Sequence, residues 1–456
     1  MLCASCGRAS DESAAACEGA ACTSVPPPAT TTSPALPDPP DTSAPAPPPP
    51  GPQPPPPSPK DGIKNGSETD IDCGGPDPST PRCAAHQGCL APNDCKSAVC
   101  GAKGPVAGRC LTAPSCTGSE GTFACGPTGN EDCCTSLPVP GGSYLRQQDP
   151  LYPATVSGFT LDKYEINVGR IRAYFEAVNG SPKAHAPSPA AGAHPKIPGS
   201  GWRSSFDVRL PSSWQEIDER LGAAGCTEGG DNSDGGAASW TPASGPYEAL
   251  PITCLDWYTL FAFCAWDGGR LPTDAEWGFA AEGGNEKRFY AWGGPADFLT
   301  WPENHAVLLL PDPAAGNAPK YTYGTPFRAI DPVSGHVNDG PAHMSPPGRT
   351  TGYGRWGHAD LTGNVLEFLL DRTPIPQGEC TDCARVDWAD PPQDQIGAYP
   401  PQWTNVPVPL EDADYPDGTR SLRGGSWDVH VPFTFYRYEY RVQRTYYAAG
   451  ARCARN

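Results

Sequence analysis

Residues 250–284 read LPITCLDWYTLFAFCAWDGGRLPTDAEWGFAAEGG, and this stretch decides the fold. Asp256 is a good N-cap residue, and the apolar residues after it recur at helical spacing until two glycines end the run. Thr273 and Glu276 form a capping box that opens a second helix, which Gly283 and Gly284 end. The stretch therefore predicts two short helices joined by a glycine-containing loop.

Two further helix starts lie upstream of this stretch. Asn167 caps a run of apolar residues at helical spacing that Gly180 closes, and Ser213 with Glu216 makes another capping box. Around these helices, short apolar stretches alternate with Gly/Pro turns. We therefore expect an α+β domain with short helices, scattered strands and much coil.

The unusual residue types are segregated along the 456 residues. Fourteen of the 20 cysteines lie in residues 1–134, whereas all 12 tryptophans lie between Trp202 and Trp427. Eighteen of the 34 residues from Pro26 to Pro59 are proline. This predicts an N-terminal segment (1–25), a disordered Pro-rich linker (26–60), a disulfide-rich module (61–134) and an aromatic-cored domain. The linker serves either as a stiff spacer or as a proline-recognition ligand.

The overall charge and cysteine content restrict partners and compartment. A net charge of -19 repels phosphate backbones and anionic lipid surfaces, so we expect no nucleic-acid partner. No run of about 18 apolar residues exists to form a transmembrane helix. Cysteines at this density are typical of an oxidising compartment, so we expect an extracytoplasmic protein in the periplasm or at the cell surface.

The N-terminus offers a membrane attachment point. The first six residues, MLCASC, leave no room for an export signal, so we expect a start site further upstream. Small residues before Cys6 resemble the end of a bacterial lipoprotein signal, which makes Cys6 (or Cys3) a candidate lipid anchor, as in an outer-membrane lipoprotein. The alternative is that Cys6 pairs with Cys17 or Cys22.

The disulfide-rich module has six cysteines between residues 73 and 110, which allow 15 pairings. Acidic residues in its first turn, from Asp61 to Asp72, form either a calcium-binding turn or a solvated one. His86 is the only nearby histidine, so disulfides are favoured over zinc. The module resembles cysteine-rich modules on surface lipoproteins of Gram-negative bacteria. Four more cysteines, at 116, 125, 133 and 134, are expected to staple the junction to the next domain.

The C-terminal two-thirds of the chain, residues 137–456, resembles the formylglycine-generating enzyme family, also called sulfatase-modifying factors. The motifs that carry the resemblance are VPGGS (139–143), LDKYE (161–165), LPITCLDW (250–257), FCAWDGGRLPTDAEW (263–277), YAWG (290–293), DLTGNVLE (360–367), LRGGSW (422–427) and GARC (450–453). They occur in the family's order. The resemblance implies a single coil-rich domain related to the C-type lectin fold.

The resemblance also implies a reaction whose key residues are missing. Family members that act on sulfatases are copper-dependent oxidases, in which two cysteines shortly after the Arg-Gly-Gly-Ser motif bind Cu(I) and oxygen converts a substrate cysteine to formylglycine. Val429 or a close neighbour stands where the first of these cysteines belongs, and no cysteine occurs from Trp427 to Arg452. Soft thiolates select Cu(I), so we expect no copper site. The favoured hypothesis is a binding protein or one of undefined activity, with the oxidase as the alternative.

The remaining cysteines are expected in disulfides. By resemblance, Cys264 and Cys453 join the helix to the C-terminus, which leaves Cys226 and Cys254 as the natural remaining pair. Cys380 and Cys383 form a C-x-x-C, read either as a local structural disulfide or as a redox or metal motif. The eight histidines are dispersed without an H-E-x-x-H pair, which argues against zinc hydrolase and iron oxygenase chemistry.

By the same resemblance, two further sites are expected. A calcium ligand loop corresponds to Asp360, Gly363, Val365 and Glu367, with Asn304 in a second site; the alternative for the two carboxylates is ordinary turn hydrogen bonding. The run from Phe435 to Arg441 falls in the region that lines the family's substrate groove. It either recognises a peptide, protein or glycan or forms a two-faced strand. Its candidate residues are Tyr436, Arg437, Tyr438 and Arg441.

Overall fold

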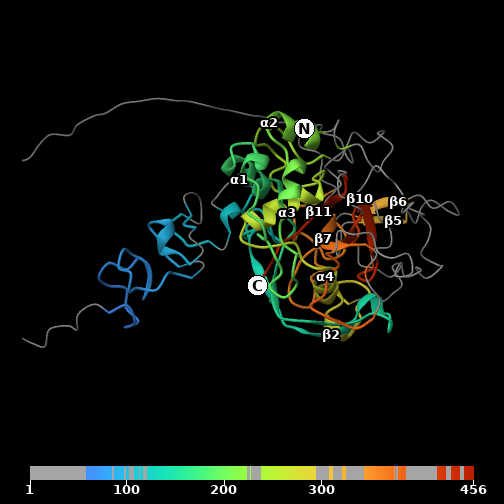
Figure 1. Ribbon diagram of the computed structural model, residues 1–456, viewed down its shortest axis with the longest axis horizontal. Helices are drawn as coiled ribbons and strands as arrows, with labels where there is room; N and C mark the ends of the chain where they lie inside the picture. Colours follow the sequence, from blue (N-terminus) through green and yellow to red (C-terminus); the bar gives the residue numbers. More distant parts are fainter. Residues whose placement is uncertain are drawn as a thin grey trace, which may run out of the picture. The chain divides into compact units, whose positions relative to one another are not determined.

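The computed structural model describes most of the chain after residue 57 (Figure 1). The described residues are 58–84, 87–96, 99–101, 107–111, 113–116, 121–222, 226, 238–293, 308–311, 321–324, 344–373, 375, 378–386, 419–427, 433–441 and 446–456. The N-terminal segment with Cys6, and all of the Pro-rich linker except residues 58–60, lie outside this set, as do Asn304 and Val429. Within it, no helix has the length and apolarity to cross a membrane.

Four α-helices begin where the sequence predicts. They are α1 (Val168–Ala177), α2 (Trp214–Leu221), α3 (Trp257–Trp266) and α4 (Asp274–Ala281). Each is preceded by an N-cap whose side chain accepts a backbone N–H bond: Asn167, Ser213, Asp256 and Thr273 in that order. The reciprocal capping box of Thr273 and Glu276 is present. These caps satisfy N–H groups that have no partner inside the helix, so the starts are encoded locally.

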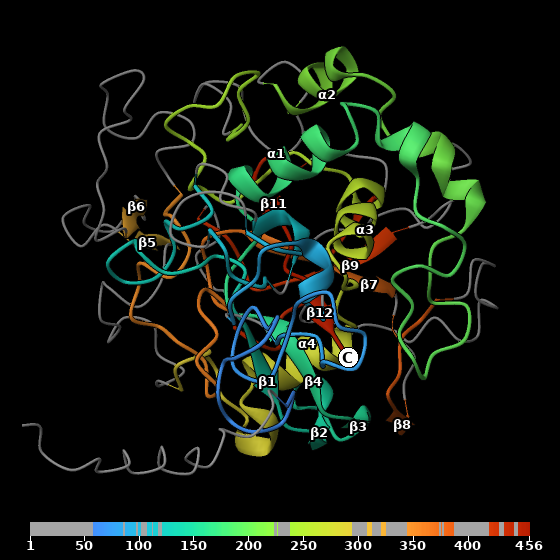
Figure 2. The same ribbon diagram turned by 90° about the vertical axis from the view of Figure 1, so that its left-hand side faces the viewer.

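In the described part of the chain, short strands form four small sheets in a mixed helix and sheet fold. Their orders are β1-β4-β12, β10-β9-β7-β11, β2-β3-β8 and β5-β6. The strands are β1 (Ser136–Val139), β2 (Gly142–Leu145), β3 (Pro153–Val156), β4 (Phe159–Asp162), β5 (Leu308–Pro311), β6 (Tyr321–Gly324), β7 (Leu366–Arg372), β8 (Cys380–Thr381), β9 (Thr419–Arg423), β10 (Tyr438–Arg441), β11 (Ala449–Gly450) and β12 (Ala454–Arg455). Both views place α1 and α2 at one end and β2 at the other (Figures 1 and 2).

The main core surrounds α3, which lies between those two ends (Figure 2). Its first eight residues are buried, so it is apolar on all sides, as expected for a central helix. Trp257 packs edge-on against Phe206 and Phe261, and its indole N–H donates to the carbonyl oxygen of Leu369 at 2.8 Å. A second core cluster surrounds α4 and includes Trp277 and Leu161.

Eight disulfides staple the described residues. In the front module, the six cysteines pair as Cys73–Cys83, Cys89–Cys100 and Cys95–Cys110, which selects one of the 15 possibilities. At the junction the pairs are Cys116–Cys134 and Cys125–Cys133. In the back domain, Cys264 pairs with Cys453, Cys226 with Cys254 and Cys380 with Cys383, the same partners as in the expected pairings.

The junction segment is tied to the back domain by buried hydrogen bonds. Asp267, at the end of α3, accepts from the backbone N–H of Ser115 at 2.8 Å. Arg170 of α1 donates to the Ser115 hydroxyl at 3.0 Å, and Asn167 donates to the carbonyl oxygen of Gly121 at 2.8 Å. The junction cysteines thus belong to the packing of the back domain as well as to the front module.

Candidate functional site

The first residue of α4, Asp274, is the centre of a buried ionic network. Arg423, the last residue of β9, donates to its two carboxylate oxygens at 2.9 and 2.7 Å. Arg437 donates to the same oxygens at 2.7 and 2.7 Å, and Ser421 adds a hydroxyl at 2.8 Å. Burial opposes ionisation, but the two guanidinium groups outweigh it and hold the pKa of Asp274 well below its usual range. The carboxylate therefore stays charged.

A second buried carboxylate, Asp371 of β7, lies beside Asp274. It accepts from the backbone N–H of Asp274 at 2.6 Å and from that of Arg385 at 3.0 Å. Burial, together with the charge of Asp274, raises the pKa of Asp371 to about 7. The pKa values of the two neighbouring carboxylates are thus shifted in opposite directions, that of Asp274 down and that of Asp371 up.

Arg423 also positions the segment that follows the Arg-Gly-Gly-Ser-Trp motif. It donates to the carbonyl oxygen of Thr434 at 3.0 Å, and the Thr434 N–H donates to the carbonyl oxygen of Phe289 at 2.9 Å. Aromatic side chains from these two segments pack together with ring centroids 4.9–5.8 Å apart. The cluster consists of Phe289, Tyr290, Trp292, Phe433, Phe435 and Tyr436, most of them half-buried.

The four predicted groove residues are divided between different environments. Tyr436 lies in the aromatic cluster, whereas the Arg437 side chain is 4% exposed and its charge is bound by Asp274. Tyr438 begins β10 and packs against the main core. Arg441 is the last residue of β10, and its side chain is not among those that the structure describes. The groove stays a prediction, with Tyr436 as its accessible member and Arg437 as a residue that positions the segment.

The carboxylate of Glu367, expected to bind calcium, has other partners. Arg452 donates to both of its oxygens at 2.7–2.9 Å, and the indole N–H of Trp277 donates at 2.8 Å. All of these groups are buried. A carboxylate already neutralised by a guanidinium offers little to a cation.

Asp360, the other expected calcium carboxylate, accepts from the Gly348 N–H at 2.6 Å and from the Thr350 hydroxyl at 3.1 Å. Gly363 and Val365 lie in the turn that leads into β7. The Val365 N–H donates to the carboxylate of Glu165 at 3.1 Å. As placed, the two carboxylates do not fit a calcium site, because protein donors occupy their oxygens. Calcium binding at these residues stays a prediction.

The described residues contain no free thiol. All sixteen described cysteines are in disulfides, and the other four, at positions 3, 6, 17 and 22, lie in the N-terminal segment. Two cysteine-containing groups are close enough to hold a metal ion, but their thiols are consumed in these bonds. Thiolate chemistry in the back domain would therefore require a disulfide to be reduced first.

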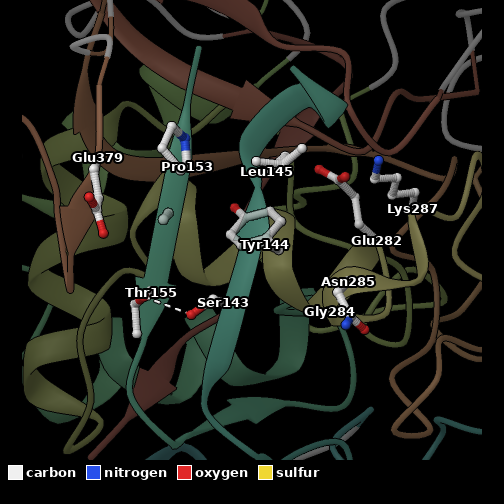
Figure 3. A pocket seen from close by; sticks show the side chains of 11 residues that line it. Ser143, Tyr144, Leu145, Pro153, Thr155, Glu282, Gly284, Asn285, Lys287 and Glu379 are labelled. Carbon is white, nitrogen blue, oxygen red and sulfur yellow. Dashed lines mark hydrogen bonds between the residues drawn. The ribbon is translucent and has the colours of Figure 1, made fainter. Parts of the chain in front are cut away.

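A cavity of about 310 Å³ opens between the β2–β3 hairpin and the loop after α4 (Figure 3). Ser143 and Thr155, whose hydroxyls are 2.8 Å apart, line its hairpin side, and Leu145 adds apolar surface. Lys287 and Glu282 line the loop side. Its volume is at the lower end for sites that bind small molecules or single side chains.

Glu282 is the unusual group of this cavity. It follows the last residue of α4 and is 0% exposed, yet in the described part of the chain neither carboxylate oxygen has a hydrogen-bond partner. Burial raises its pKa to about 8, with Arg423 lowering and Asp274 raising the value to smaller extents. The nearby Gln147 backbone N–H also lowers the pKa but makes no hydrogen bond to it. Such a carboxyl group is mostly protonated at pH 7.

Sequence reasoning missed Glu282 and the pairing of Asp274 with its arginines. One local signal pointed to Glu282: it is an acidic residue at the C-terminal end of a helix, where the dipole favours a cation. No local signal pointed to the Asp274–Arg423 pair, whose members are 149 residues apart.

Comparisons with known proteins identify a family for the back domain. A family model described as the sulfatase-modifying factor enzyme 1-like domain matches residues 122–456. Over 160 residues the chain is 42% identical to the inactive C-alpha-formylglycine-generating enzyme 2 of Mus musculus, covering 34% of this chain and 44% of that protein. The Bos taurus protein of the same name is 48% identical over 151 residues, covering 33% and 42%.

A bacterial relative and a solved structure complete the comparison. The formylglycine-generating enzyme of Streptomyces coelicolor is 32% identical over 147 residues, covering 30% of this chain and 40% of that one. The chain thus spans less than half the length of these three relatives. The structure of PvdO from Pseudomonas aeruginosa aligns with a TM-score of 0.37 and 16% identity, covering 70% of this chain and 94% of that one.

Proposed function

Because the chain belongs to the family of sulfatase-modifying factor enzyme 1-like domains, we propose that it is an extracytoplasmic binding protein that does not generate formylglycine. The observation that carries the proposal is the distribution of thiols. No cysteine follows the Arg-Gly-Gly-Ser-Trp motif until Cys453, and Cys453 is bonded to Cys264. Without a pair of thiolates, the chain has no soft-ligand set for Cu(I) in this domain.

Two relatives support a non-catalytic function. These curated proteins, 42% and 48% identical over the matched regions, carry the word inactive in their names. The buried network around Asp274 ties α4 to β9 and to the segment before β10 through side-chain bonds. We further propose that the fold is related to C-type lectins, and that the partner is a peptide, protein or glycan bound near the aromatic cluster. Calcium at Asp360 and Glu367 would require their present hydrogen-bond partners to be displaced.

The compartment is part of the proposal. Eight disulfides within the described residues favour an oxidising environment, the periplasm or the cell surface. We propose that Cys6 carries a lipid and that the Pro-rich linker holds the folded part away from the membrane. Metabolic labelling with an alkynyl fatty acid tests this: Cys6→Ser is expected to abolish the label. A label that survives in Cys6→Ser and in Cys3→Ser would refute the anchor.

The alternative is a copper-dependent oxidase that acts on a sulfatase cysteine. To separate the two functions, the full chain is titrated with Cu(I) against a chromogenic chelator. Oxygen uptake is then followed with a peptide containing Cys-x-Pro-x-Arg, with the Streptomyces coelicolor enzyme as positive control. We expect no peptide-dependent oxygen uptake. Peptide-dependent oxygen uptake with formation of an aldehyde would overturn the proposal. Cu(I) held by the N-terminal cysteines alone would not produce this oxygen uptake.

A further inference from the structure

The buried acidic residues of the back domain follow a common pattern. Most are bound by a guanidinium group inside the protein, usually through two nitrogen–oxygen contacts. Examples are Asp162 with Arg170 and Arg455, Glu248 with Arg172, Asp274 with Arg423 and Arg437, Glu276 with Arg270, and Glu367 with Arg452. Others, such as Asp371, accept backbone N–H groups instead. Both solutions offset the cost of burying a carboxylate.

Glu282 is bound neither by a guanidinium group nor by backbone N–H groups among the described residues. Its two oxygens have no hydrogen-bond partner among the described residues, although the side chain is fully buried. Arg423 and Arg437 are close enough to influence its charge, but both are bound to Asp274. The hydroxyl of Tyr144, a residue of β2, donates to the carbonyl oxygen of Ala275 and not to Glu282. An unsatisfied buried carboxyl group is costly and therefore calls for a functional explanation.

The cavity beside Glu282 provides room for the missing partner. Figure 3 shows the Glu282 side chain on the loop side of the cavity, with its carboxylate near Leu145, and Glu379 across the hairpin. Lys287 is the one basic residue of the lining; it is exposed and forms no ion pair with Glu282 in the described part of the chain. The hydroxyls of Ser143 and Thr155 supply hydrogen-bond acceptors on the opposite wall.

We propose that this cavity binds a guanidinium group, such as the end of an arginine side chain, with Glu282 as its counter-ion. The proposal rests on the proposed binding function and deepens it, because it adds this cavity to the surface near the aromatic cluster as a second contact site and names the ligand chemistry that it would take. A guanidinium has N–H donors in a planar fork that satisfies both oxygens of one carboxylate, whereas an ammonium is a point charge. It is also the group by which this domain neutralises most of its other buried acids.

Binding requires one local movement and one proton release. The carboxylate oxygens of Glu282 are covered by the protein, so the side chain must turn them into the cavity. No hydrogen bond holds them, so this rotation breaks none. A cation in the cavity favours the charged carboxylate, so the group loses its proton as the ligand binds. The unbound carboxyl group is protonated at pH 7, because its pKa is raised by burial to about 8.

The test is calorimetric titration of the full chain at pH 7. The probes are agmatine and an acetyl-Gly-Arg-Gly-amide peptide, with the citrulline peptide as the uncharged isostere of arginine. Titration in two buffers with different ionisation enthalpies measures proton release. Glu282→Gln keeps the side-chain shape and removes the charge. Glu286→Gln is the matched control, because Glu286 is an exposed glutamate of the same loop that does not line the cavity.

We expect an arginine-containing probe to bind with release of close to one proton, and the citrulline peptide to bind at least tenfold more weakly. Glu282→Gln should weaken binding at least tenfold, while Glu286→Gln changes it less than twofold. Tighter binding of the peptide than of agmatine would identify a polypeptide partner, and the reverse a small guanidine. No binding of either probe at 10 mM, or equal binding by Glu282→Gln, would overturn the proposal. Because these readouts do not involve oxygen, they are independent of the oxidase assay.

Discussion

Glu282 makes the free energy of unfolding of the back domain depend on pH, and the substitution Glu282→Gln removes this contribution. Its pKa is about 8 in the folded protein and 4.5 in the unfolded chain. Between these values the folded state holds a proton that the unfolded state has lost, so the free energy of unfolding falls as pH rises through this range. The full loss is about 5 kcal/mol, of which about 3–4 kcal/mol falls between pH 5 and pH 8.

Glu282→Gln cannot titrate and therefore lacks this contribution. We expect the wild type to lose about 3–4 kcal/mol of unfolding free energy relative to the variant between pH 5 and pH 8. Other groups that titrate in this range, such as Asp371 with a pKa of about 7, contribute equally to both proteins and cancel in the difference.

The assay is urea unfolding at pH 5, 6, 7 and 8, followed by tryptophan fluorescence. All 12 tryptophans lie between Trp202 and Trp427, so the signal reports the back domain and not the front module. Glu286→Gln, which removes an exposed carboxylate from the same loop, should keep the wild-type pH dependence. Parallel pH profiles for wild type and Glu282→Gln would refute the argument that this carboxyl group is buried without a partner.

Three further predictions use the same unfolding assay at pH 7. Asp274→Asn leaves two buried guanidinium groups without their carboxylate and should cost at least about 3–5 kcal/mol; a loss below 1 kcal/mol would contradict the ionic network. Arg452→Met leaves Glu367 charged and buried and should cost about 3–5 kcal/mol, unless added calcium restores stability, which would revive the calcium site. Replacing Cys264 and Cys453 by alanine opens a link across 189 residues and should cost up to about 5 kcal/mol; an unchanged urea midpoint would argue against the bond.

Local features were predictable from sequence, and long-range ionic pairing was not. Asn167 and Asp256 mark helix starts because an N-cap bonds to N–H groups three residues away. The pairing of Cys264 with Cys453 followed from a resemblance that spans the domain. By contrast, Asp274 meets Arg437 only after α4 and the segment before β10 are packed together. No periodicity in the sequence specifies such a contact.

The candidate site also has one part that could be predicted from the sequence and one part that could not. The absence of cysteines between Trp427 and Arg452, on which the proposed lack of copper chemistry rests, could be recognised without a structure, because the motif that ends at Trp427 is intact. The lack of a partner for Glu282 could not, because it depends on which donors surround the end of α4. Tyr144, Arg423 and Gln147 all lie near, and each is a donor that makes no hydrogen bond to Glu282.

The buried ionic network holds this part of the scaffold together through side chains of the chain itself. Asp274 joins the first turn of α4 to β9 and to the segment before β10, through bonds that require no metal. Arg452 similarly joins the C-terminal strands to Glu367 of β7. None of these bonds involves a cysteine, so they are compatible with the proposed absence of a copper site after Trp427. The proposed binding function needs only such a scaffold and a group that a partner can reach.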